Sequence, residues 1–181
     1  MKAIIYPAPW TKKELSSRAD ELEEILDGTW REAASRYTAI LNIRHEANTK
    51  VPKGVQRYLN DVLDERFSEA GWNGKEGRFR KGNTWVRITF RHQMSLGSDF
   101  IDALRLSKQD GVRECILIAC TSKFLEVVTP SDASSVISFE KIAREVQRLN
   151  GSLDINLFYG SLSAKSKLSK DVHQAINGRL K

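Results

Sequence analysis

Residues 84–91 alternate apolar and polar positions along the chain. The two sets are Val86, Ile88 and Phe90 on one side and Arg87, Thr89 and Arg91 on the other. This period of two predicts a strand with one buried face and one polar face. We expect it to be a central strand of the sheet, with its polar face carrying a site.

Three other segments have strand patterns. Residues 2–6 are a short apolar run that ends at Pro7 and predicts an edge strand. Residues 113–121 are apolar on both faces, which is typical of a central strand. Residues 153–159 alternate again and predict a further strand.

Apolar residues at helical spacing predict helices between these strands. Thr11 and Glu14 have capping-box spacing and open a long amphipathic helix that extends to about residue 37. Pro52 opens a second helix, which Gly71 ends. Residues 37–43 alternate but follow a helix directly, so a turn or a short strand is expected there.

Three further helices are expected in the second half of the chain. Ser98 is a plausible N-cap for a helix that ends near Asp110, and a helix over residues 138–149 is expected to begin at Ser138. The basic tail ends in a short helix with Leu168, Val172, Ile176 and Leu180 on one face. Residues 71–83 and 130–135 have the composition of loops.

Strands that alternate with helices predict an α/β fold with a mixed central sheet flanked by helices. The 181 residues fit a single domain that spans the whole chain, with a basic C-terminal tail from about residue 160 to 181. The formal charge is +6 and the isoelectric point is about 9.4, which favours an anionic partner. The positive charge is concentrated in residues 75–91 and in the tail.

Other features exclude several classes of protein. The two cysteines, Cys115 and Cys120, form no CxxC motif and lie in an apolar strand, so we expect core packing in a reducing cytoplasm. No signal peptide and no apolar run of transmembrane length occurs, so we expect no membrane partner. Neither a phosphate-binding glycine motif nor a hydrolase nucleophile motif is present.

The basic segment combines charge with aromatic residues. Its basic residues flank Trp72, Phe79 and Trp85, so groups suited to phosphates and to bases occur together. These basic residues are Lys75, Arg78, Arg80 and Lys81. The alternative is a solubilising loop whose tryptophans pack inside. Asp61 with Asp64 or Glu65, and Asp99 with Asp102, have the spacing of a metal-ligand pair on a helix. Such pairs are mostly solvated helix faces, and no metal is predicted from them.

The order of these elements resembles the type II restriction endonucleases of the BglII and BstYI group, which have the PD-(D/E)xK nuclease fold. Three blocks carry the resemblance: residues 69–72 followed by the strand 86–90, the spacing from Phe90 to Asp99, and the segment Ser134-Ser135-Val-Ile-Ser-Phe-Glu140. The resemblance covers roughly residues 10–160. It implies a restriction-endonuclease-like sheet and a homodimer that grips double-stranded DNA.

The resemblance also implies which side chains read bases. By position these are Arg91, His92, Asp132, Ser134 and Ser135, and their chemistry suits base edges. For the serines, a helix N-cap is the alternative role.

The catalytic motif departs from the family's pattern. The family holds Mg²⁺ with an Asp before the strand and with the Glu of a Glu-x-Gln strand motif. Here Arg87 and Thr89 occupy the Glu and Gln positions, and Glu76 is the sole carboxylate between Gly71 and Phe90. An arginine repels Mg²⁺ but pairs well with phosphate.

The sequence therefore predicts a degenerate nuclease that binds DNA without a cofactor. It would act as a dimer or as a recognition or regulatory subunit beside a catalytic protein, in restriction or phage defence. A Mg²⁺-dependent nuclease that uses the relocated acids Glu76, Asp99 and Asp102 is one alternative. A protein-interaction scaffold for an acidic partner is another.

Overall fold

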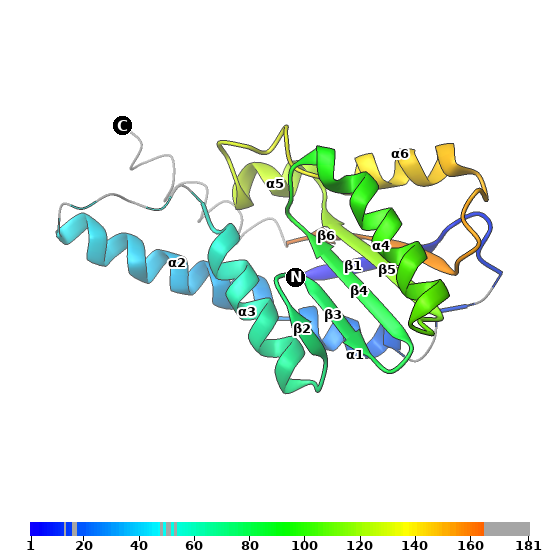
Figure 1. The fold of residues 1–181 in the computed structure, drawn as a ribbon. Coiled ribbons are helices and arrows are strands. Elements are labelled where there is room, and N and C mark those ends of the chain that lie inside the picture. The colour runs from blue at the N-terminus through cyan, green and yellow to red at the C-terminus, as the bar shows by residue number, and fades with distance from the viewer. Residues whose placement is uncertain (13, 16–17, 48, 50–51, 53, 165–181) are drawn as a thin grey trace.

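The structure is a computed structural model that describes residues 1–12, 14–15, 18–47, 49, 52 and 54–164. In this part of the chain six strands form one mixed sheet, in the order β1-β6-β5-β4-β3-β2. The strands are β1 (Lys2–Pro7), β2 (Asn73–Lys75), β3 (Arg78–Lys81), β4 (Thr84–Thr89), β5 (Glu114–Cys120) and β6 (Leu157–Ser163). Helices flank the sheet (Figure 1), so the predicted α/β class with a mixed central sheet is confirmed.

The centre of the sheet is parallel. Strand β5 lies between β4 and β6 and runs parallel to both, while β1 and the β2–β3 hairpin extend the sheet with antiparallel strands. The register aligns Thr89 with Ala119, and Ala119 with Ser161. The carboxyl ends of the three parallel strands therefore meet at one edge, and the segments that follow them gather there.

The helices form two layers. Helices α1 (Arg18–Leu26), α2 (Thr29–Glu46) and α3 (Gln56–Glu69) share one hydrophobic cluster with the sheet, which α5 (Ser122–Val128) also joins. Helices α4 (Leu96–Gln109) and α6 (Phe139–Leu149) share a second cluster on the opposite face. A 3₁₀ turn, η1 (Gln93–Ser95), precedes α4.

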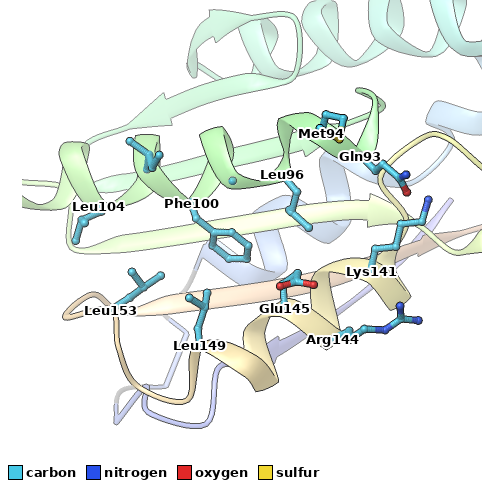
Figure 2. Close-up of a pocket in the computed structure, with 12 residues that line it drawn as sticks. Gln93, Met94, Leu96, Phe100, Leu104, Lys141, Arg144, Glu145, Leu149 and Leu153 are labelled. Atoms are coloured by element: carbon cyan, nitrogen blue, oxygen red, sulfur yellow. The ribbon is translucent and has the colours of Figure 1, made fainter.

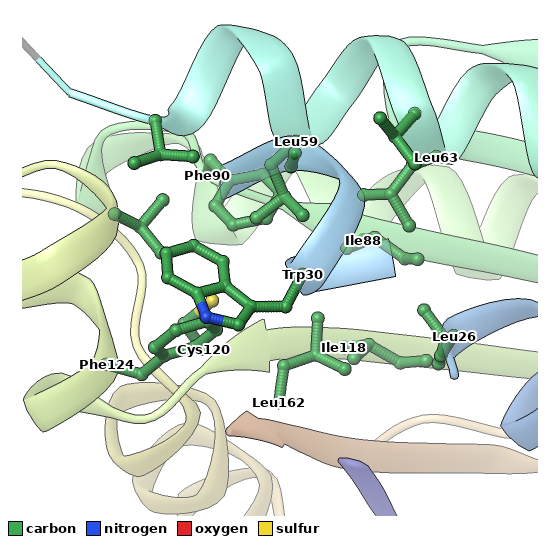
Figure 3. Close-up of a cluster of buried hydrophobic side chains, with 14 of the residues drawn as sticks. Leu26, Trp30, Leu59, Leu63, Ile88, Phe90, Ile118, Cys120, Phe124 and Leu162 are labelled. Atoms are coloured by element: carbon green, nitrogen blue, oxygen red, sulfur yellow. The ribbon is translucent and has the colours of Figure 1, made fainter. Parts of the chain in front are cut away.

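Aromatic side chains tie the first layer together. Trp30 packs edge-on against Phe124 with ring centroids 4.8 Å apart (Figure 3), and Phe67 stacks on Phe79 at 3.9 Å. The Trp30 Nε1 atom is buried and has no hydrogen-bond partner within the described residues. This layer is held mainly by apolar contact.

The prediction of one long first helix is wrong in two respects. Thr11 is not an N-cap, because its Oγ1 donates to the Leu157 carbonyl at 2.8 Å and accepts from the Leu157 amide at 3.1 Å. Gly28 has φ +72° and separates α1 from α2. Helix α2 then continues to Glu46, so residues 37–43 are helical and not a turn or strand.

The glycine-rich segment 71–83 is also not a loop. It forms the β2–β3 hairpin, with Glu76 at φ +55° and Gly77 at φ +73° in the turn between the strands. Gly77 lies so close to the Ile88 carbonyl oxygen that an added Cβ would stand 2.0 Å from it. The glycines therefore serve a tight turn against β4.

Other element boundaries differ from the predictions. Helix α4 begins at Leu96, which places Ser98 inside the helix and not at its cap, and β6 begins four residues later than expected. Helix α5 was not predicted. The edge position of β1, the helix end at Gly71 and the N-cap Ser138 are confirmed. The predicted tail helix falls on residues 165–181, outside the described residues.

Candidate nucleic-acid interface

The polar side of β4 is buried and does not face solvent. Arg87 has 3% of its surface exposed and Thr89 has 1%, because α4 covers this side of the strand. The prediction that only one face of this strand is buried is therefore wrong, because every residue of β4 is buried. Arg91, just beyond the strand, has an intermediate exposure.

Arg87 is held by α4 and by the β2–β3 turn. Its Nε lies 3.2 Å from Oδ1 of Asp99, a carboxylate that is itself buried, and its Nη1 donates to the Glu76 carbonyl at 2.9 Å. Arg91 Nη1 donates to the same Asp99 oxygen at 3.0 Å. Two guanidinium groups therefore share one carboxylate oxygen.

Positive charge exceeds negative charge at this cluster. Burial lowers the pKa of Arg87, the nearby carboxylate of Asp99 raises it, and the positive charges of Arg78 and Arg91 lower it further. Asp99 Oδ2 accepts no hydrogen bond and Arg87 Nε donates none within the described residues. Among the described residues, the three guanidinium groups of Arg78, Arg87 and Arg91 face only the carboxylates of Asp99 and Asp102, so the remaining positive charge favours an additional anion.

A cleft of about 840 Å³ opens beside this cluster, between α3 and the β2–β3 hairpin. The residues that line it are Gln56, Arg57, Asn60, Asp61, Asp64, Lys75, Glu76, Arg78, Arg87 and Arg91. Arg78 lies directly opposite Arg87 in the β3–β4 register. The cleft is consequently cationic on its sheet side and mixed on its helix side.

The two segments expected to read bases lie side by side. His92 forms an isolated β-bridge with Val136, the Ile137 amide donates to the Arg91 carbonyl at 2.8 Å, and the Gln93 amide donates to the Ser135 carbonyl at 2.7 Å. Both segments lie at the edge where the parallel strands end. His92, Asp132 and Ser134 are exposed there.

Local hydrogen bonds fix the shape of this edge. His92 Nδ1 accepts from the Met94 amide at 3.3 Å, and Ser135 Oγ donates to the Asp132 carbonyl at 2.9 Å. Lys141 Nζ donates to the carbonyls of Ser134 and Val136 at 2.6 and 2.8 Å. Ser138 is the N-cap of α6, so the exposed hydroxyl of Ser134 is not used for that role.

Two of the basic residues expected at the interface point elsewhere. Lys81 Nζ pairs with Glu21 at 2.6 Å on the α1 side, and Arg80 Nη2 donates to the Asp110 carbonyl at 2.7 Å. Neither residue lines the cleft. Of the four basic residues predicted in this segment, Lys75 and Arg78 therefore line the cleft with Arg87.

The aromatic residues of this segment are not available to stack on bases. Trp72, Phe79 and Trp85 are buried, with exposed fractions of 3%, 0% and 4%. Trp72 Nε1 donates to Glu21 at 3.1 Å. The alternative in which the tryptophans pack inside is correct.

The fallback acids do not assemble into a metal site. Asp99 is engaged by two arginines, and Asp102 lies 3.9 Å from Arg78 and 3.7 Å from Arg105. Both oxygens of Asp64 accept from the Glu76 amide, at 2.9 and 3.1 Å. Within the described ranges, no group of three or more His, Cys, Asp or Glu residues could hold a metal ion.

The cysteines are structural. Burial raises the pKa of Cys115 to about 12 and also raises that of Cys120, so neither is an activated thiol. Both are free and buried.

An apolar groove of about 600 Å³ lies between α4 and α6 (Figure 2). Leu96, Phe100, Leu104, Leu149 and Leu153 contribute to it, and Lys141, Arg144 and Glu145 form a charged side. On α4 and in the turn before it, Ile101 and Met94 are 67% and 82% exposed. Two exposed apolar side chains therefore stand beside the groove.

The sequence singled out Asp61 and Asp64 on α3 only as a possible metal-ligand pair, and it gave no signal for the other α3 residues of the cleft. Gln56, Arg57 and Asn60 belong to a polar helix stripe that looks like any solvated face. Lys141, which holds the Ser134 loop, was missed for the same reason. These residues become part of a cleft only because the β2–β3 turn lies close to α3 in the folded protein.

Comparisons with protein-family models, with curated proteins and with solved structures find no match to this chain. None of the described helices has the length and apolar character needed to cross a membrane.

Proposed function

We propose that this protein binds double-stranded DNA and does not cleave it. The observation that supports the proposal is that a cationic cleft and the two segments expected to read bases lie next to each other at one edge of the sheet. A cleft with Arg78, Arg87 and Arg91 on one side adjoins the bridged segments that expose His92 and Ser134. Arginines suit phosphates, and short polar side chains suit base edges.

The same charges disfavour metal-dependent cleavage. Arg78 and Arg87 lie opposite each other, and Arg91 shares Asp99 with Arg87. A divalent cation would meet these three guanidinium groups, whereas a phosphate would be attracted by them. The role is therefore that of a restriction-endonuclease-like protein without catalysis, which recognises DNA in the cytoplasm for restriction or phage defence.

The partner in this proposal is a second copy of the chain. The α4–α6 groove lies beside the exposed side chain of Ile101. In a two-fold symmetric dimer, Ile101 of each copy can therefore enter the groove of the other copy. Arg144 and Glu145 at its side are neighbours of opposite charge, which suits a self-complementary contact. The groove also includes Gln93, so a second copy would bring a second DNA-reading edge close to the first.

A binding titration tests the proposal. Labelled duplex DNA should bind with nanomolar to micromolar affinity. Three phosphate contacts predict that affinity falls about 40-fold between about 50 and 200 mM salt. Plasmid incubated with Mg²⁺ or Mn²⁺ should stay uncut. Absence of salt-sensitive binding, or metal-dependent nicking, would overturn the proposal.

A further inference from the structure

The cleft beside Arg87 is larger than a phosphate needs. Its volume of about 840 Å³ lies in the range of sites for whole small molecules, roughly 300–1,000 Å³. A backbone phosphate resting on Arg78, Arg87 and Arg91 would leave the α3 side of the cleft empty. The cleft therefore has room for a second part of a ligand.

The α3 side has the wrong charge for DNA backbone. Asp61 and Asp64 line this side beside a single cation, Arg57, so carboxylates outnumber positive charges there, and a carboxylate repels phosphates. Gln56 and Asn60 lie one helical turn apart, so they share a face of α3. Amides and a carboxylate match the hydrogen-bonding edges of nucleobases, since Asn and Gln pair with adenine and Asp accepts from amino groups.

Three of these side chains have unused hydrogen-bonding capacity. Gln56 Nε2 makes a long contact of 3.4 Å to the Phe90 carbonyl, while Asn60 and Asp61 have no hydrogen bond or ion pair to any described residue. Across the cleft, the side chains of Arg78 and Arg91 are 53% and 36% exposed, so a ligand can reach both guanidinium groups, while the buried Arg87 contributes its positive charge. Both sides thus offer accessible polar groups to a ligand.

We infer that the cleft holds one unpaired nucleotide of bound DNA. Its phosphate lies on Arg78, Arg87 and Arg91, and its base lies against Gln56, Asn60 and Asp61. The inference rests on the proposed DNA binding and adds the kind of DNA that is preferred: a duplex with a bulged, flipped or terminal unpaired nucleotide. Such a nucleotide has already lost most of its stacking and pairing, so placing it in the cleft costs little.

The test compares a matched duplex with the same duplex carrying one bulged 2-aminopurine. The bulged duplex should bind at least about tenfold more tightly, a difference of about 1.4 kcal/mol, and the 2-aminopurine fluorescence should change on binding. Asn60→Ala and Asp61→Ala should each reduce this preference without weakening matched-duplex binding. Glu69→Ala, on the same helix but outside the cleft, is the control and should change neither.

Titration with single deoxynucleoside monophosphates separates this inference from the proposed function. Weak, saturable binding that Asn60→Ala removes supports the cleft site even if no duplex binds. Equal affinity for matched and bulged duplexes, with no mononucleotide binding, would overturn the inference and leave duplex binding standing. Loss of duplex binding alone would overturn the proposed function and not the cleft site.

Discussion

The guanidinium of Arg87 and the carboxylate of Asp99 form a buried ion pair, with 3.2 Å between Nε and Oδ1 and side-chain exposures of 4% and 1%. Arg91 adds a second guanidinium to the same oxygen. Asp99 thus offsets part of the charge that the proposed function assigns to phosphate binding, and it holds two arginines toward the cleft.

Removing Asp99 should destabilise the fold strongly. Asp99→Ala leaves the Arg87 charge buried without its partner, and breaking a buried pair in this way costs about 3–5 kcal/mol. Urea denaturation measures the loss. Asp102→Ala on the same helix is the control, because its contacts of 3.7 and 3.9 Å are partly exposed, and it should cost less than about 1 kcal/mol. An equal loss in the free energy of unfolding for both variants would contradict a larger contribution from the buried ion pair.

Gly77 and Gly82 give a matched test of the hairpin. Both have positive φ, +73° and +59°, but an added Cβ at Gly77 would stand 2.0 Å from the Ile88 carbonyl, while Gly82 has open space. Gly82→Ala should cost about 1 kcal/mol from backbone strain alone, and Gly77→Ala considerably more. The melting temperatures of both variants in thermal unfolding measure this difference in stability. Similar melting temperatures would contradict the close packing of the turn on β4.

Glu140 should make stability depend on pH. It accepts from the Ser122 amide at 3.0 and 3.2 Å and from Ser122 Oγ at 2.7 Å. Burial raises the pKa of Glu140, but these hydrogen bonds lower it by more, so its pKa lies below the ordinary 4.5. The stabilisation is then fully present above the unfolded pKa and is lost as pH falls through the folded pKa.

Glu140→Gln therefore lowers stability near neutral pH, by about 1–2 kcal/mol. The difference from the unmodified protein should shrink when unfolding is measured at about pH 3.5 instead of about pH 7. A difference that stays constant between these two pH values would contradict the assigned role of the ionised carboxylate.

Ile101 should control self-association. Ile101→Glu places a charge in the proposed two-fold contact and should convert a dimer to a monomer in light scattering coupled to size-exclusion chromatography. Ile43→Glu is the control, since Ile43 is 59% exposed on α2, away from the α4–α6 groove. A monomer before any substitution, or a dimer that survives Ile101→Glu, would contradict the second copy as partner.

The strands with unambiguous patterns could be predicted from the sequence. Apolar residues on both faces identified β5, and alternation identified β4. The predictions were wrong where a local pattern is compatible with two conformations. Residues 37–43 alternate between apolar and polar positions but continue α2. The glycines of residues 71–83 form a hairpin and not a loop. The physical reason is that packing against α3 and β4 decides between these conformations.

The candidate site was predictable only in part. The resemblance singled out Arg87, Arg91 and the Ser134 segment as candidates, but an alternating pattern cannot show that α4 buries Arg87 or that Asp99 is its partner. The stripe with Gln56 and Asn60 carries no local signal of a site. Whether the observed sheet belongs to the restriction-endonuclease-like group stays a prediction from the resemblance.

The most direct test of DNA binding is the dependence of duplex affinity on salt for single arginine variants. Arg78→Ala and Arg91→Ala should each weaken binding and reduce the slope of log affinity against log salt by about 0.9, the value for one lost phosphate contact. Arg113→Ala, at the opposite end of the parallel strands, should leave the slope unchanged. Equal slopes for all three variants, or no measurable duplex binding, would contradict the central claim.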